Sequence, residues 1–136
     1  MAASEIAGFL KVQLLEQGYK ANPLDDDAVG SAASGLKFYI QAYESSIQFR
    51  CLLSLEPEAT NWLDFCNTFN RKMRFIKIYV DAEDESLLAE ADWWLDTEGV
   101  ELSRQFKQAM DFWEASLAAL KEELRSLVSA EAPAEH

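Results

Sequence analysis

Alternating apolar and polar residues predict two pairs of strands in this chain. Two alternating runs lie close together between residues 36 and 55, separated by a break at Glu44-Ser45. A period of two is typical of strands with one buried face, and two such runs in succession predict an antiparallel hairpin. The buried set is Leu36, Phe38, Ile40 and Ala42 in the first run and Ile47, Phe49, Cys51, Leu53 and Leu55 in the second. A second pair is predicted over residues 75–80 and 87–95, with a turn from Asp81 to Ser86.

Apolar residues spaced by three and four predict helices in three other segments. The first runs from Ser4 to Gln17, with Ser4 as its N-cap and Gly18 as its stop. The second runs from Pro57 to Lys72, with proline at the first helical position. The third runs from about Val100 to Val128 and carries three heptads of an apolar seam. The seam residues are Phe106, Met110, Trp113, Leu117, Leu120, Leu124 and Leu127.

These elements predict an α+β fold in the order α-(β)-β-β-α-β-β-α. Lys20 to Gly35 is loop-like, and whether Ala28–Ala33 forms a strand stays open. Because the strands come in hairpins, we expect an antiparallel sheet with helices packed on one face. The last helix approaches about 43 Å and an eight-residue strand spans about 27 Å, so the end of the helix should overhang the sheet or pack on something else. Residues 1–128 are predicted to form a single domain, followed by a flexible tail over residues 129–136.

Composition and charge narrow the function classes. A chain of 136 residues with 49% hydrophobic content fits one domain. Its 12 Lys and Arg against 24 Asp and Glu give a net charge of −12, which argues against nucleic-acid binding and against docking on an anionic membrane. We find no signal segment and no apolar run of 18 residues, so the predicted location is the cytoplasm. Cys51 and Cys66 are interpreted as buried reduced thiols.

Residues suited to catalysis or metal binding are sparse. The single histidine, His136, lies in the tail, where it cannot hold a nucleophile in place. Four acidic residues follow positions 1, 3, 5 and 12 of a calcium-loop spacing: Asp81, Glu83, Glu85 and Asp92. However, Ser86 stands where that loop needs glycine, and a strand follows instead of a helix. We therefore interpret these residues as a solvated hairpin turn.

Three other charged groups have structural interpretations. Glu90 and Asp92 share one strand face, where paired carboxylates do acid–base work only in a pocket that raises one pKa. Asp25-Asp26-Asp27 is interpreted as a hydrated loop. The one basic patch, Arg71 to Arg74 with Lys77, is interpreted as a helix end and a strand start that pair with neighbouring acids. No catalytic, cofactor-binding or metal-ligating residue is therefore predicted, and no cofactor.

The aromatic content exceeds what one sheet and its helices need. The chain has 4 Trp, 8 Phe and 4 Tyr. One interpretation is that most of these side chains are core or half-covered. The competing interpretation is a self-association or partner surface, because large exposed apolar areas need covering. The candidate residues are Trp62, Phe65, Phe69, Trp94, Tyr39, Leu120 and Leu124.

The stretch from Asn67 to Asp81 resembles the YbjN-domain family of small bacterial proteins. In that family a helix ending in paired asparagines runs into an Arg-Phe-x-Lys-x-Tyr-x-Asp strand, which matches Arg74 to Asp81 here. A strand with Glu90 and Asp92 and a long helix continue the match, so the resemblance covers Leu36 to Leu124. The chain departs from the family at residues 83–85, where acidic residues replace a frequent glycine.

The resemblance implies a fold similar to type III secretion chaperones: a curved antiparallel sheet with helices on it, often dimeric. The family is described as bacterial sensory transduction regulators. No enzyme activity is associated with it, and it carries no established site residues.

Three hypotheses about function follow. We expect a non-enzymatic bacterial protein-interaction domain, chaperone-like or regulatory, which takes a protein or peptide partner on a sheet edge or an apolar strip. The second hypothesis is a self-assembling structural homodimer that uses the Trp62 helix or the heptad seam. The third is a divalent-ion-binding or hydrolytic protein that uses Glu90, Asp92 and the Asp81 turn.

Overall fold

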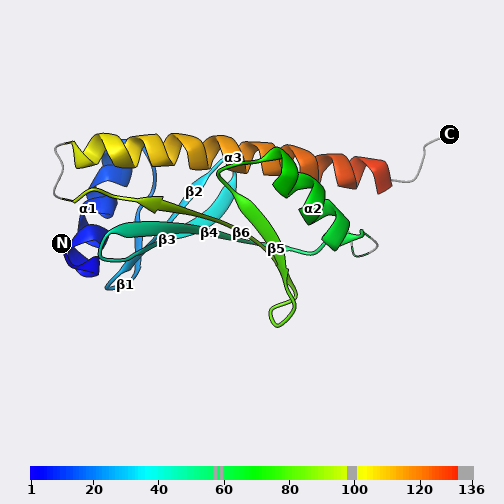
Figure 1. Ribbon diagram of the computed structural model, residues 1–136, viewed down its shortest axis with the longest axis horizontal. Helices are drawn as coiled ribbons and strands as arrows, with labels where there is room; N and C mark the ends of the chain where they lie inside the picture. Colours follow the sequence, from blue (N-terminus) through cyan, green and yellow to red (C-terminus); the bar gives the residue numbers. More distant parts are fainter. Residues whose placement is uncertain (57, 59, 98–100, 132–136) are drawn as a thin grey trace.

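A computed structural model describes residues 1–56, 58, 60–97 and 101–131 of the chain (Figure 1). The predicted α+β class and element order are confirmed, with one strand added near the N-terminus. The elements are α1 (Ala3–Glu16), β1 (Asn22–Asp25), β2 (Ala28–Ala33), β3 (Leu36–Ala42), β4 (Ser46–Ser54), α2 (Trp62–Lys72), β5 (Lys77–Asp81), β6 (Ser86–Trp94) and α3 (Leu102–Glu131). No helix in this part of the chain is long and apolar enough to span a membrane.

All six strands form one antiparallel sheet in the order β1-β2-β3-β4-β6-β5. Both predicted hairpins are present, as β3–β4 and β5–β6. The longest pairing joins β4 to β6, from Ser46 opposite Trp94 to Ser54 opposite Ser86. After β4 the chain passes through α2 and forms β5 at the edge of the sheet. It then returns as β6, which fills the position between β4 and β5.

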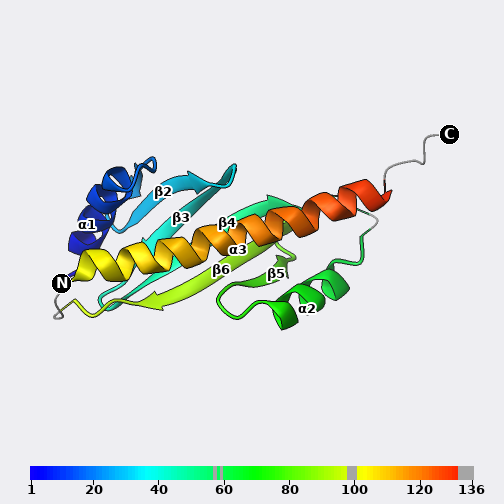
Figure 2. The same cartoon turned by 90° about the horizontal axis from the view of Figure 1, so that it is seen from above.

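The helices cover one face of this sheet (Figures 1 and 2). Seen from above, α3 crosses the sheet diagonally, with α1 on one side and α2 on the other (Figure 2). Trp113 of α3 is fully buried, stacked on Phe49 at 5.1 Å between ring centroids and edge-on to Phe38 at 5.7 Å. The first five seam residues, from Phe106 to Leu120, are all fully buried.

The far end of α3 extends past the sheet, as its predicted length required (Figure 2). At this end Leu124 and Leu127 are only partly buried. The helix continues three residues beyond its predicted end at Val128, so residues 129–131 belong to it. The remainder of the predicted tail lies outside the described residues.

Both shorter helices begin at other residues than predicted. Ser4 lies inside α1, whose N-cap is Ala2, and the Glu5 carboxylate accepts the Ala2 N–H at 3.1 Å. Helix α2 begins at Trp62 because the Asn61 side chain caps it, accepting the Asp64 N–H at 3.1 Å. An asparagine cap outweighs the preference for proline at the first position. Pro57 and Val100, the predicted helix starts, lie outside the described residues.

Residues 22–33 form two strands where mainly loop was predicted. Alanine, glycine and serine have low strand propensity. However, β2 is buried between its neighbouring strands and α1, and this tertiary packing determines its strand conformation. Ser34 and Gly35 both have positive φ, 53° and 76°. Two such residues make the tight hairpin turn that brings β2 alongside β3.

The outer edge of β5 is closed by an asparagine of α2. The Ile78 N–H donates to Asn70 Oδ1 at 2.8 Å, and Asn70 Nδ2 donates to the Ile78 carbonyl at 2.9 Å. The side-chain amide therefore occupies the hydrogen-bonding positions of a further strand. The opposite edge, β1, has four residues, contains Pro23 and is irregular between Pro23 and Asp25. Both edges thus carry features that discourage strand addition.

We expect Asn70→Ala to lower the free energy of unfolding by about 1–3 kcal/mol, because it leaves the peptide group of Ile78 without its partners. Asn67→Ala is the matched control, because Asn67 is an exposed asparagine on the same helix, and it should cost less than about 0.5 kcal/mol. Urea unfolding of both variants measures the difference. Equal losses would show that Asn70 does not hold this edge.

Candidate partner-binding face of the sheet

The sheet face opposite the helices carries apolar side chains that no described part of the chain covers. The open face of an antiparallel sheet is ordinarily polar. Here four large side chains are exposed on it: Trp94 (78%), Leu24 (57%), Leu52 (48%) and Tyr79 (39%). They come from β6, β1, β4 and β5, so apolar surface is spread across the sheet.

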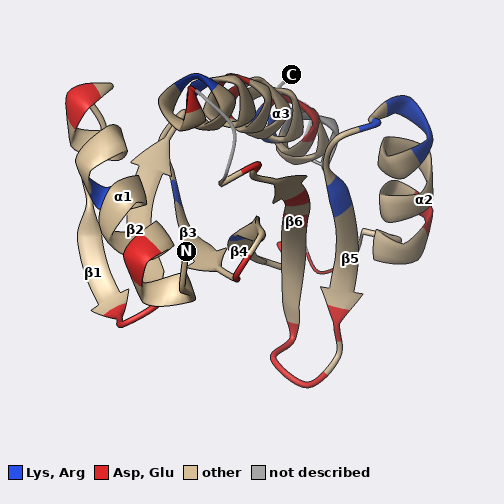
Figure 3. Cartoon of the chain, turned by 60° about the vertical axis from the view of Figure 1, so that its left-hand side comes forward, with Lys and Arg blue, Asp and Glu red and all other residues tan. Residues whose placement is uncertain are grey.

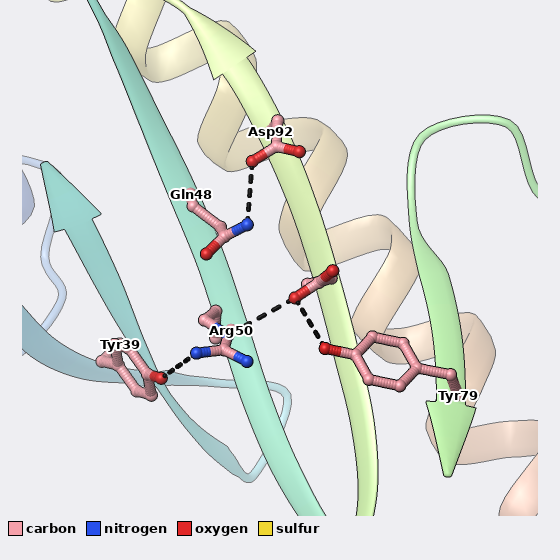
Figure 4. Close-up of polar contacts among 6 residues, drawn as sticks. Tyr39, Gln48, Arg50, Tyr79 and Asp92 are labelled. Carbon is pink, nitrogen blue, oxygen red and sulfur yellow. Dashed lines mark hydrogen bonds and ion pairs between the residues drawn. The ribbon is translucent and has the colours of Figure 1, made fainter. Parts of the chain in front are cut away.

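A row of polar side chains crosses this face from β3 to β5 (Figure 4). Arg50 lies in the middle, where its Nη1 donates to the Tyr39 hydroxyl at 3.0 Å and its Nε lies 3.4 Å from Glu90 Oε2. On the far side, the Tyr79 hydroxyl donates to Glu90 Oε2 at 3.1 Å. The row therefore fixes four side chains on four adjacent strands.

The electrostatics of the row favour a charged Arg50 and a neutral Tyr79. Burial alone would lower the pKa of Arg50, but Tyr79, Tyr39 and Glu90 outweigh it and raise that pKa above its ordinary value. The pKa of Tyr79 is raised by burial and by the charge of Glu90, against the opposing effect of Arg50. At neutral pH Arg50 is therefore charged and the Tyr79 phenol is neutral.

A second polar pair lies next to the row, towards Trp94. Gln48 Nε2 donates to Asp92 Oδ1 at 3.1 Å across β4 and β6 (Figure 4). On the other side of the row, Leu88 is buried although it belongs to the open face, because it lies between its cross-strand neighbours Leu52 and Tyr79. The face thus has a polar centre with apolar side chains on both sides.

A family model described as "Putative bacterial sensory transduction regulator" matches residues 4–126. The chain belongs to the YbjN family. The fold agrees with this: the crystal structure of YbjN from E. coli, described as a putative transcription regulator, matches with a TM-score of 0.63 at 16% identity, covering 86% of this chain and 92% of that one. An uncharacterized protein from Methanothermobacter thermautotrophicus matches with a TM-score of 0.53 at 15% identity, over 88% and 96%. No curated protein matches the sequence.

The stretch that resembles YbjN proteins has structural tasks in this fold. Asn70 closes the edge of β5, and Lys77 Nζ donates to the Met73 carbonyl at 3.0 Å at the end of α2. Tyr79 belongs to the polar row. Asp81 accepts the N–H of Glu83 at 3.0 Å and so shapes the β5–β6 turn.

Most of the charged groups singled out in the sequence lie apart from one another, although Lys77 stands opposite Glu90 in the β5–β6 pairing. Acidic residues gather on the β5–β6 turn and basic residues at the end of α2 (Figure 3). In the basic patch, Lys72 pairs with Glu123 at 3.0 Å, as predicted, whereas Arg71 donates to the backbone carbonyl of Asn67 and not to an acid. Within the described ranges, no three His, Cys, Asp or Glu side chains converge as a metal site.

The seven predicted surface residues fall into different environments. Trp62 (8% exposed), Phe69 (3%) and Leu120 (0%) are buried in the core of the protomer and present no side chain to a partner. Phe65 packs against Trp62 and Phe69 and is partly exposed, and Leu124 lies at the overhanging end of α3. Only Tyr39 and Trp94 lie on the open face.

Sequence reasoning missed Arg50, Tyr79, Leu24 and Leu52 on this face. Leu52 had a detectable signal, because an apolar residue stands at a polar position between Arg50 and Ser54. Leu24 had none, since its strand was taken for loop.

Both cysteines are reduced and buried, as predicted. Cys51 donates its thiol to the Lys37 carbonyl at 3.2 Å, and burial raises the pKa of this thiol to about 11. Burial also raises the pKa of Cys66. At neutral pH neither side chain is the thiolate that nucleophilic chemistry needs.

We expect Glu90→Gln to lower the pKa of Tyr79, because it removes a charge that opposes ionisation of the phenol. Folding raises this pKa, so the folded state favours the neutral phenol. The contribution of Tyr79 to the free energy of unfolding is therefore complete below the ordinary tyrosine pKa of about 10, and it is lost as the pH rises through the pKa of the folded state. An NMR titration that follows the tyrosine ring carbons measures the pKa of Tyr79. Asp92→Asn, which alters the neighbouring pair, should leave the pKa of Tyr79 unchanged, and an equal shift in both variants would contradict the assigned contact.

Proposed function

We propose that this YbjN-family chain is a non-enzymatic, chaperone-like or regulatory module that binds a polypeptide on the open face of its sheet. The observation that carries the proposal is the exposure of Trp94, Leu52 and Leu24 on a sheet face that is otherwise well ordered. Uncovered apolar area of this kind marks interaction surfaces. Tryptophan is also a residue that often dominates binding energy when a partner buries it.

Binding across the face is favoured over addition of a strand at an edge. Asn70 occupies the N–H and the carbonyl of Ile78 at the β5 edge, and β1 is short and irregular. The face, by contrast, offers apolar side chains on both sides of a polar centre. Because Tyr39, Arg50 and Glu90 already hold one another in place, a partner would lose little free energy in ordering them.

Charge suggests the character of the partner. The chain carries a net charge of −12, which speeds the encounter with a basic partner and disfavours an acidic one. A basic segment with apolar side chains is therefore the partner class that we propose.

A homodimer is the second candidate. The observation that favours it is the overhanging end of α3, where Leu124 and Leu127 are partly buried and Val128 is exposed. Of the predicted dimer residues on α3, only Leu124 is accessible to a second copy, because Leu120 is buried within the protomer.

We expect a photo-crosslinking amino acid at position 52 or 94 to capture one discrete heterologous protein in bacteria that express the chain. Leu63 provides the control, because it is an exposed leucine on α2, away from this face, and the same group there should not capture that protein. With the captured protein purified, Trp94→Asp should weaken its binding by about 30-fold, the usual loss for a central tryptophan.

Two outcomes would contradict the proposal. Identical products at all three positions would indicate nonspecific contact. A second copy of the chain as the product would favour the homodimer.

A further inference from the structure

A cavity of about 520 Å³ opens at the corner of the open face formed by β1 to β4. Its wall includes Leu24 and Leu52 as apolar side chains and Tyr39 and Arg50 from the polar row. Gly30 also lines the cavity, with Leu24 packed above it: a Cβ on Gly30 would lie 3.5 Å from Leu24 Cδ2. Sites for small ligands in proteins have volumes of about 300–1,000 Å³ and combine apolar walls with a few polar groups.

The cavity is positively charged although the chain is strongly acidic. Lys20, Lys37 and Arg50 line it, and no carboxylate does. In the whole chain, acidic residues outnumber basic ones by 24 to 12, so a lining with three cations and no acid departs from the composition.

Most of this charge is not neutralised by neighbours. Glu90, which lies on β6 and does not itself line the cavity, pairs with Arg50 at 3.4 Å. Across the described part of the chain, neither Lys20 nor Lys37 forms an ion pair. Two of the three cations are thus available to a ligand, and Arg50 is held in a fixed position by Tyr39 at 3.0 Å (Figure 4).

We propose that this cavity binds a small organic monoanion, with its carboxylate towards Lys20 and Lys37 and its aliphatic body against Leu24 and Leu52. The charge selects the anion, and the leucines select a ligand with an apolar part. This site does not depend on the proposed polypeptide partner, and it would give the module a small-molecule effector on the face where the partner binds.

Octanoate is a suitable probe, with octanol as its uncharged counterpart. We expect octanoate to cause saturable shifts of backbone amides in a ¹⁵N NMR titration, confined to residues 20–24, 30–32, 37–39 and 50–52. Lys37→Gln should weaken binding by about threefold, the effect of one exposed charge pair. Lys11→Gln, which removes the same charge from the exposed surface of α1, should leave the affinity unchanged.

The proposal fails if octanoate causes no saturable shift at millimolar concentration, or if the shifts map to another part of the sheet. It also fails if octanol binds as tightly as octanoate, or if Lys11→Gln weakens binding as much as Lys37→Gln. Failure of the crosslinking experiment alone would leave this site intact.

Discussion

The packing of α3 on one face of the sheet is the interaction on which the rest of the molecule depends. Trp113 stacks on Phe49 and meets the edge of Phe38, so residues far apart in the chain form one aromatic centre. Burying such side chains is the dominant favourable contribution to folding. Helix α3 packs on the same face of the sheet as α1 and α2, so the helices leave the opposite face uncovered.

The uncovered face follows from the geometry of strands. Side chains alternate between the two faces of a strand, so each strand that supplies the core also supplies the open face. Trp93 packs against Phe75 and Phe112 on the helix side, while its neighbour Trp94 is exposed on the other. The polar row from Tyr39 to Tyr79 orders the open face without covering it, and Asn70 keeps the edge from pairing. The open face, the polar row and the capped β5 edge together support the proposal that another molecule covers this face.

The sequence was most informative where side-chain periodicity was strong. Strands β3 to β6 and the seam of α3 were predictable because alternation and heptad spacing report directly on burial. Strands β1 and β2 were not, because small residues such as Gly30 and Ser31 become strand only through the neighbours that pack on them.

The candidate surface was predicted less well. An aromatic residue in an amphipathic helix can belong to a surface or to a core, and the contacts that bury Trp62 and Leu120 are tertiary. For Leu52 the reverse holds. The sequence shows that this leucine stands among polar residues on the outer face of its strand, but not which side chains lie beside it in the sheet.

In the free protein the helices seal one face of the sheet and leave the other exposed. Hydroxyl-radical footprinting with mass spectrometry tests this arrangement on the four tryptophans of the chain. We expect fast oxidation of Trp94, slower oxidation of Trp93, and strong protection of Trp62 and Trp113. Protection of Trp94 equal to that of Trp113, or equal rates at Trp93 and Trp94, would contradict it.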